Sequence, residues 1–369
     1  MLSERRALRA ILAMVLSVPL LLVACEDNPV ASGPDQGPRG SIDAAIDTAL
    51  AARIDGYLQT LPGDEAGLSV LVRHDDAIVY YGSRGVQSKS TGRQLSEHSL
   101  FRLASVSKTF TAVAVMQLVE RGEIGLDDSV LEYFPELDAS WAPVTIHMLL
   151  AHRAGTYDFL NDFIGSPWRQ GITNQKVLDY FAERPRLKFA PGTQAGYSNS
   201  NYVLLAEVIS RVAGRSFADY MKETLFEPLG MTRTYFRDSE KPLSEDETLN
   251  YAERDTYFGL HTYTVGPMGM VSSTYEIDLF MRALSGGELL DAALLDRMLA
   301  PYSTLFGASY GYGFMFGDDW YGHGGSLDGA QTSITFYPQR NAHLILLSNG
   351  GSRTYAYMRN VAAIVEAYY

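Results

Sequence analysis

Short apolar runs rich in β-branched and aromatic residues lie near both ends of the chain, and polar residues bound each of them. Runs of this length and composition are typical of β-strands. They occupy residues 68–72, 78–81, 334–337 and 344–347. The polar residues between the first two runs predict a hairpin, and a turn at residues 338–341 joins the last two.

Between these strands the apolar residues recur mainly at helical spacing. The segment 106–121 is apolar nearly all round, as in a buried helix, and it stops at Gly122. A capping box begins at Ser273, which predicts the start of another helix. Helices are therefore predicted from Ser41 to Leu58, over 106–121, over 202–213, from residue 273 onward and over 355–369.

The order of these elements predicts an α+β fold. Strands at both ends with helices between them imply an antiparallel sheet built from the N- and C-terminal strands and flanked by helices, an α/β sandwich with an inserted helical lobe. No linker, repeat or low-complexity segment interrupts the chain after Ser41. We therefore expect one domain over residues 42–369.

The first 41 residues have a different character. Three arginines within the first nine residues precede an apolar stretch, 11–24, that is short for a membrane span, which needs about 20 residues. Its end, Leu-Val-Ala-Cys, resembles the lipobox of bacterial lipoproteins. This resemblance implies a signal peptide over 1–24, lipid attachment at Cys25, a flexible tether over 25–41 and an exported protein anchored to the bacterial cell envelope. The alternative is an ordinary signal peptide with an incidental cysteine.

Composition excludes several classes of protein. Hydrophobic residues make up 46% of the chain and charged residues 20%, as in soluble globular proteins. A net charge of −13 argues against a nucleic-acid partner, which needs clustered basic residues. Cys25 is the single cysteine, so no intramolecular disulfide can form. The seven histidines contain no His-x-x-x-His pair, which disfavours a zinc hydrolase.

The first candidate chemistry is at the start of the buried helix. Ser105 and Lys108 are three residues apart, so they share a helix face. A lysine out of contact with water has a lowered pKa and can accept the proton of a neighbouring hydroxyl. The alternative is a helix-capping serine with a solvated lysine. Lys108 lies two residues before Phe110 in an otherwise apolar helix, which favours the desolvated position.

A second candidate is Tyr197-Ser198-Asn199, which we expect on a loop before the helix over 202–213. Tyr197 can carry a proton, and Asn199 can hydrogen-bond a substrate amide. The alternative is a core tyrosine followed by a helix cap at Asn199 or Ser200.

The third candidate is Gly322-His323-Gly324-Gly325-Ser326, just before the C-terminal strands. Glycines allow a substrate backbone to approach a strand edge closely, and His323 offers a titratable donor. The alternative is a glycine-rich hairpin with an ordinary histidine.

Together, in this order and spacing, the three motifs resemble those of the serine β-lactamase and D-Ala-D-Ala carboxypeptidase family, particularly its class C-like branch. Shorter stretches at 101–104, 125–128, 149–155, 228–231 and 266–270 are also similar to the family. The resemblance runs from about Leu68 to Asn349 and implies a β-lactamase/transpeptidase-like fold.

The resemblance also implies the roles of individual residues. Ser105 would be the nucleophile that forms an acyl-enzyme, with proton transfer by Lys108 and Tyr197. Asn199, His323, Gly325 and Ser326 would bind the substrate. The oxyanion hole would consist of the backbone N–H groups of Ser105 and Ser326. No metal and no cofactor is implied.

The third motif departs from the Lys-Thr-Gly found in much of the family. His323 replaces the permanent cation and would be only partly charged near neutral pH, because its reference pKa is about 6.5. Gly324 has no hydroxyl group. Both changes weaken the case for binding a substrate carboxylate, and therefore for efficient penicillin hydrolysis.

We therefore expect a serine hydrolase at the cell envelope, a D-Ala-D-Ala carboxypeptidase-like peptidase, amidase or esterase that acts as a monomer on small-molecule or peptide substrates. The alternatives are a class C-like β-lactamase and a non-catalytic module that binds penicillin or peptidoglycan. An α/β-hydrolase would need Gly-x-Ser-x-Gly, and the nearest stretch ends in Asp328.

Overall fold

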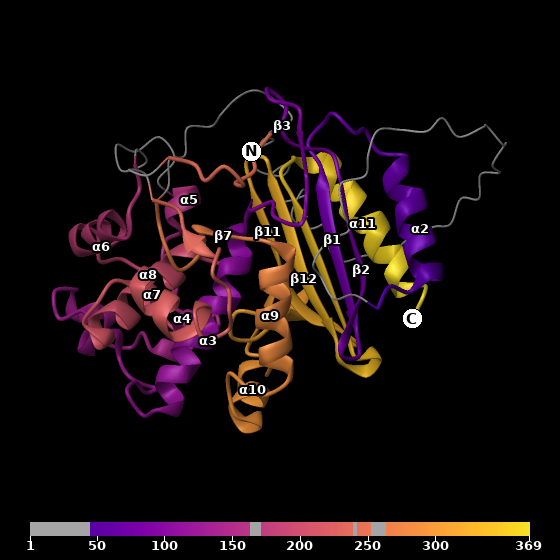
Figure 1. Ribbon diagram of the computed structural model, residues 1–369. Coiled ribbons are helices and arrows are strands. Elements are labelled where there is room, and N and C mark those ends of the chain that lie inside the picture. The colour runs from indigo at the N-terminus through magenta and orange to yellow at the C-terminus, as the bar shows by residue number, and fades with distance from the viewer. Residues whose placement is uncertain (1–44, 163–170, 239–241, 252–262) are drawn as a thin grey trace, which may run out of the picture.

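The computed structural model describes residues 45–162, 171–238, 242–251 and 263–369 (Figure 1). The signal peptide, Cys25 and the tether over 25–41 lie outside these residues. An eight-stranded antiparallel sheet of order β2-β1-β13-β12-β11-β10-β9-β8 forms the centre, so the N-terminal hairpin pairs with the C-terminal one as predicted. Its strands are β1 (Leu68–His74), β2 (Ala77–Arg84), β8 (Ser303–Leu305), β9 (Ala308–Tyr310), β10 (Met315–Phe316), β11 (Tyr321–Leu327), β12 (Ala330–Tyr337) and β13 (Ala342–Ser348).

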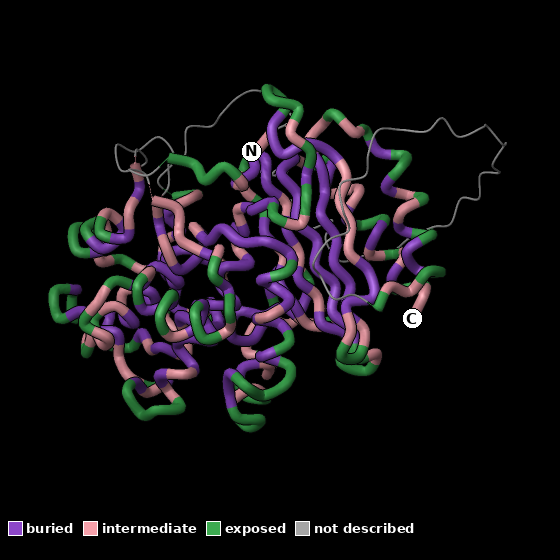
Figure 2. Tube along the Cα trace, viewed as in Figure 1, coloured by how far each residue is buried: buried purple, intermediate pink, exposed green. Residues whose placement is uncertain are grey.

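Helices cover both faces of the sheet, which confirms the predicted α+β architecture. Alternate residues of a strand point to opposite faces, so Val70 of β1 packs with α2 (Thr48–Gln59) and α11 (Ser352–Glu366). The next residue, Leu71, belongs to the larger core on the other face, with α3 (Ser107–Glu120) and α9 (Thr274–Ser285). The tube in Figure 2 is buried along the central strands and along the inner helices.

The helical lobe lies beside α3, on the face of the sheet opposite to α2 and α11 (Figure 1). Its helices are α4 (Ile146–Leu150), α5 (Phe159–Asp162), α6 (Asn174–Glu183), α7 (Asn199–Ala213), α8 (Phe217–Met221) and α10 (Ala292–Met298). Two small sheets contain β3 (Val86–Ser88) with β4 (Arg93–Gln94), and β5 (Phe101–Arg102) with β7 (Met270–Ser272) and β6 (Tyr235–Phe236). Single turns of 3₁₀ or π helix occur at Ala104–Val106, Val130–Glu132, Ala139–Trp141, Lys222–Phe226 and Pro338–Arg340. Within the described residues, no helix is long and apolar enough to cross a membrane.

The first described helix begins later than the sequence predicts. Helix α2 starts at Thr48 rather than at Ser41, and residues 45–47 are not helical. Asp47 has an extended backbone, and its carboxylate accepts hydrogen bonds from the N–H groups of Ala49 (3.0 Å) and Leu50 (3.1 Å). A carboxylate in this position satisfies the free N–H groups of the first turn, so the helix begins after Asp47 although the apolar spacing starts earlier.

The predicted helix at Ser273 is present, with its cap. Ser273 Oγ accepts a hydrogen bond from Glu276 N (3.2 Å). The carboxylate of Glu276 makes other contacts, accepting from Arg233 N (2.8 Å) and Thr234 Oγ1 (2.6 Å). It therefore anchors the chain before β6 to the start of α9.

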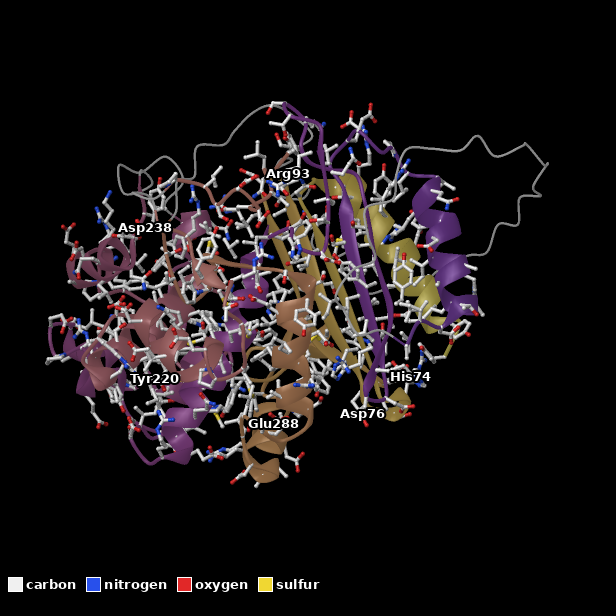
Figure 3. The ribbon with its side chains drawn as sticks, in the orientation of Figure 1. His74, Asp76, Arg93, Tyr220, Asp238 and Glu288 are labelled. Atoms are coloured by element: carbon white, nitrogen blue, oxygen red, sulfur yellow. The ribbon has the colours of Figure 1, made fainter. Side chains whose placement is uncertain are left out.

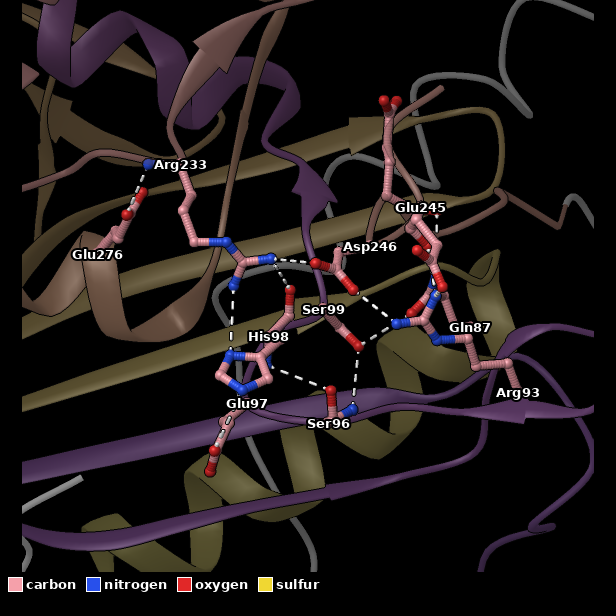
Figure 4. A network of polar contacts seen from close by, with 11 residues as sticks. Gln87, Arg93, Ser96, Glu97, His98, Ser99, Arg233, Glu245, Asp246 and Glu276 are labelled. Carbon is pink, nitrogen blue, oxygen red and sulfur yellow. Dashed lines mark hydrogen bonds and ion pairs between the residues drawn. The ribbon is translucent and has the colours of Figure 1, made fainter. Parts of the chain in front are cut away.

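A network of charged and polar side chains continues from Arg233 through Asp246 to Arg93 (Figure 4). Asp246 accepts from the guanidinium groups of both Arg233 and Arg93, each at 2.6 Å. These contacts tie the segment 244–247 to the β3–β4 hairpin. At the far end of the sheet, His74 lies at the β1–β2 turn (Figure 3) and stacks on Tyr369 at 4.3 Å between ring centroids.

Candidate active site

Ser105 lies in the 3₁₀ turn Ala104–Val106, directly before α3. Its neighbours Ala104 and Val106 are buried, whereas Ser105 is partly exposed. Ala104 has φ +49°, a left-handed conformation that non-glycine residues seldom adopt. The turn is held by hydrogen bonds from Leu103 N to Met270 O (2.9 Å) and from Thr332 Oγ1 to Leu103 O (2.8 Å). The strained turn and these hydrogen bonds thus fix the backbone that carries the Ser105 hydroxyl.

Lys108 is fully buried, and its amine is surrounded by three oxygen atoms. Nζ lies 3.1 Å from Ser105 Oγ, 2.8 Å from Asn199 Oδ1 and 3.0 Å from the carbonyl of Pro267. Burial lowers the Lys108 pKa from 10.5 to about 7. Two of the three oxygens can only accept, whereas the serine hydroxyl can also donate. In a neutral amine, the two hydrogens would satisfy the amide and carbonyl oxygens, and the lone pair would face the hydroxyl of Ser105.

Tyr197 covers the other side of this amine. The centre of its ring is 4.9 Å from Lys108 Nζ. Burial raises the pKa of Tyr197 above 10 and outweighs the lowering effect of a hydrogen bond with Ser105. The tyrosine therefore keeps its proton at neutral pH, and of the two groups Lys108 is the better base.

Asn199 is the first residue of α7, not a loop residue before a helix that begins near Tyr202. Ser198 occupies the position before the helix, but its side chain makes no capping hydrogen bond. The Asn199 side chain extends from this first turn to Lys108, and the residue is 5% exposed.

Two further groups at the site were not predicted from the sequence. Asp158 accepts a hydrogen bond from Asn199 Nδ2 (3.1 Å), and the Pro267 carbonyl accepts one from Lys108 Nζ. Asp158 is a single acidic residue in an aromatic stretch, and the Pro267 group belongs to the backbone, so neither forms a recognisable motif.

The glycine-rich motif, which we expected just before the C-terminal strands, itself forms a strand of the sheet, β11. Strand β10 pairs only with Tyr321 and Gly322, so among the described residues the edge of β11 beyond Gly322 has no strand partner on that side. A Cβ atom on Gly325 would lie 2.5 Å from Leu103 O and 3.0 Å from Ala104 Cβ. Glycine at this position thus allows β11 to pack against the turn that carries Ser105. Ser326 follows on the same strand and is exposed.

His323 differs from its expected state. The residue is 5% exposed, and burial together with the positive charge of Lys108 lowers its pKa to about 3. Its Nδ1–H donates to Gly324 O (2.5 Å), which leaves Nε2 to accept from the Tyr310 hydroxyl (3.2 Å). The expectation of a partly charged histidine was wrong, because the ring is enclosed between these groups and kept neutral.

His152 packs behind Tyr197, with 4.4 Å between ring centroids. Its Nδ1 accepts a hydrogen bond from Ser198 N (3.2 Å), so it supports the backbone between Tyr197 and Asn199. Within the part of the chain that the structure describes, no group of three His, Cys, Asp or Glu side chains is arranged to hold a metal ion.

Comparison with protein families matches residues 50–367 to the model described as Beta-lactamase. Among curated proteins, the chain is similar to "Penicillin-binding protein 4*" of Bacillus subtilis (strain 168), with 29% identity over 313 residues, covering 76% of this chain and 67% of that protein. It is also similar to "Esterase EstB" of Burkholderia gladioli, with 35% identity over 218 residues, covering 54% of each. The chain thus spans about two thirds of the first relative and about half of the second.

Among solved structures, the fold is similar to that of the D-amino acid amidase from Ochrobactrum anthropi SV3. The TM-score is 0.72 at 26% identity, and the likeness covers 86% of this chain and 98% of the other.

Proposed function

Since this chain belongs to the Beta-lactamase family and is a serine hydrolase, we propose that it cleaves esters or amides of small molecules and peptides through an acyl-enzyme at Ser105. The observation that carries the proposal is the position of the Lys108 amine, 3.1 Å from Ser105 Oγ, combined with a pKa of about 7. A general base works best when its pKa is close to the working pH.

The reaction follows from this geometry in two halves. Lys108 takes the proton of Ser105 as Oγ attacks the substrate carbonyl, and the backbone N–H groups of Ser105 and Ser326 stabilise the resulting oxyanion. The proton passes by way of Tyr197 to the leaving alcohol or amine, the C–O or C–N bond breaks, and an ester on Ser105 remains. Water then attacks this ester, giving up a proton to the same base. The acid product leaves, and Oγ regains its hydrogen.

Two features of β11 favour a substrate without a free carboxylate next to the scissile bond. Neutral His323 supplies no positive charge, and Gly324 supplies no hydroxyl. The similarity to an esterase and to a D-amino acid amidase supports this substrate class. Because the family includes β-lactamases, penicillin hydrolysis is the second candidate.

Intact-protein mass spectrometry tests the proposal. The protein is mixed with short p-nitrophenyl esters, D-amino acid amides, D-Ala-D-Ala peptides and a penicillin, and the mass gain is mapped to the peptide that contains Ser105. An acyl group from the ester or amide is expected. A stable adduct with penicillin alone would favour a penicillin-binding module, and efficient turnover of penicillin would favour the β-lactamase.

The pH dependence of ester hydrolysis follows from the Lys108 pKa. Only the neutral amine can accept the Ser105 proton, so kcat/KM should be low at pH 5 and rise to a plateau near pH 8, with its midpoint at about 7. Stopped-flow or plate assays with p-nitrophenyl acetate measure the profile, corrected for hydrolysis without enzyme. A midpoint near 10 would mean that the lysine keeps its ordinary pKa, which would contradict the proposed base.

We also propose that the protein is exported and held at the bacterial cell envelope by lipid on Cys25, as the lipobox-like end of the apolar segment supports. Replacing Cys25 with alanine should move the protein from the detergent phase to the aqueous phase in Triton X-114 partitioning. Incorporation of radiolabelled palmitate should be lost as well. Partitioning that is identical for the two proteins would rule out the anchor.

A further inference from the structure

Asp158 is a buried acidic residue next to the site and has no role in the reaction described above. It lies in the loop before α5 and is 2% exposed. Its carboxylate accepts hydrogen bonds from Asn161 Nδ2 (2.6 Å) and Leu160 N (3.3 Å). On the side of the site it accepts from Asn199, through the backbone N (3.2 Å) and Nδ2 (3.1 Å). Burial raises the pKa of Asp158, and the hydrogen bonds from these donors oppose that effect, because they favour the ionised carboxylate.

The contact with Asn199 determines which way round its amide lies. Nδ2 faces the carboxylate, so Oδ1 faces Lys108 Nζ at 2.8 Å. If the amide were reversed, its oxygen would face a carboxylate and its N–H groups would face the lysine amine. An N–H group directed at the neutral amine would occupy the lone pair that the Ser105 proton must reach.

We propose that Asp158 is a positioning residue of the active site, which holds the Asn199 amide so that the Lys108 amine keeps its lone pair directed at Ser105. The inference rests on the proposed acyl-transfer function and deepens it. It also gives Asn199 a second role beside the predicted binding of substrate, because both ends of its amide already have partners in the protein.

The other polar groups around Lys108 cannot replace Asp158. Tyr197 and Tyr202 present their rings, at 4.9 and 5.7 Å from Nζ to the centroids, and both keep their protons because burial raises their pKa values. His152 and His323 have lowered pKa values and are neutral. Asp158 is the group whose negative charge raises the Lys108 pKa, against the larger effect of burial.

The test is the pH profile of the near-isosteric variant Asp158→Asn with p-nitrophenyl acetate. Loss of the negative charge should move the midpoint of kcat/KM to lower pH, by about 0.5–1 unit. Loss of the fixed amide orientation should lower the plateau at least about tenfold, because the reversed amide becomes accessible. A merely structural role would lower the plateau without moving the midpoint.

Two further variants make the result specific. Asp162→Asn is the matched control, since Asp162 accepts from Asp158 N (2.6 Å) and pairs with Lys188 (2.6 Å) but does not contact Asn199. It should retain the wild-type midpoint. The exchange Asp158→Asn with Asn199→Asp restores a donor opposite a carboxylate, and this carboxylate now faces Lys108. Its midpoint should return to the wild-type value or exceed it.

A second measurement is independent of turnover. The protein is labelled with ¹³C at lysine Cε, and the Lys108 signal is assigned by its loss in Lys108→Met. Its titration midpoint should fall in Asp158→Asn and not in Asp162→Asn. An unchanged midpoint for Lys108 in Asp158→Asn would overturn the inference, whether or not the protein hydrolyses the ester. If the wild-type protein shows no Ser105-dependent turnover, the proposed function fails, and the NMR titration still decides the link between Asp158 and Lys108.

Discussion

Replacing Ser105 with alanine is expected to reduce ester hydrolysis by at least about 10⁴-fold and to abolish the acyl adduct. The substitution removes Oγ, the atom that forms the covalent bond in the proposed reaction, whereas the backbone of the turn should keep its conformation. Lys108 loses one of its three oxygen neighbours, so the free energy of unfolding should change by no more than about 1 kcal/mol. Burst kinetics and intact mass measure the loss of acylation, and urea unfolding measures stability.

Ser107 provides the matched control for this substitution. It lies two residues further along, at the start of α3, and is fully buried. Its Oγ has no hydrogen-bond partner among the described residues, so Ser107→Ala removes no contact that the reaction uses. Wild-type acylation is expected for this variant. If Ser105→Ala were as active and as readily acylated as Ser107→Ala, Ser105 could not be the nucleophile.

Replacing Lys108 with methionine should lower kcat/KM by about 10³–10⁴-fold, because a side chain of similar length then lacks the base. The pH profile of the remaining activity should no longer rise with a midpoint near pH 7. Asn199 Oδ1 and the Pro267 carbonyl lose their donor, and each unsatisfied buried acceptor costs about 1–3 kcal/mol. Removal of a desolvated amine offsets part of this cost.

The comparison variant for this prediction is Lys222→Met. The side chain of Lys222 is 64% exposed and pairs weakly with Glu227, at 3.5 Å. The substitution should leave kcat/KM and the midpoint of the pH profile as in the wild type. A Lys108→Met protein that is folded and nearly fully active would show that another group takes the Ser105 proton.

The fold was largely predictable, because its strands and helices differ in the spacing of their apolar residues. The two terminal hairpins were predicted from short β-branched runs, and their pairing across the sheet followed from their positions at the ends of the chain. The start of α2 was not predicted, because the apolar spacing begins before Asp47, the residue whose side chain caps the first turn of the helix.

At the site, proximity was predictable and electrostatic state was not. Ser105 and Lys108 are close because they are three residues apart on adjoining helical turns. His323 was expected to be partly charged. Its pKa of about 3 results from burial and from the nearby Lys108, which is 215 positions away along the chain. The residues next to His323 in the sequence therefore could not predict that Lys108 lies beside it.

The sequence by itself determined the class of this protein. The spacing of apolar residues predicted the α+β fold, and the resemblance of three short motifs, in their order, to those of a known family predicted a serine hydrolase, because motifs and apolar spacing are local properties of a chain. Only the tertiary structure determined the protonation states of the groups in the site. The Lys108 pKa depends on burial and on the charge of Asp158, while the Asn199 amide and the Pro267 carbonyl contact the amine, and these groups converge from separate elements. Desolvation and charge act through space, so the residues that adjust the base are near it only when the chain is folded.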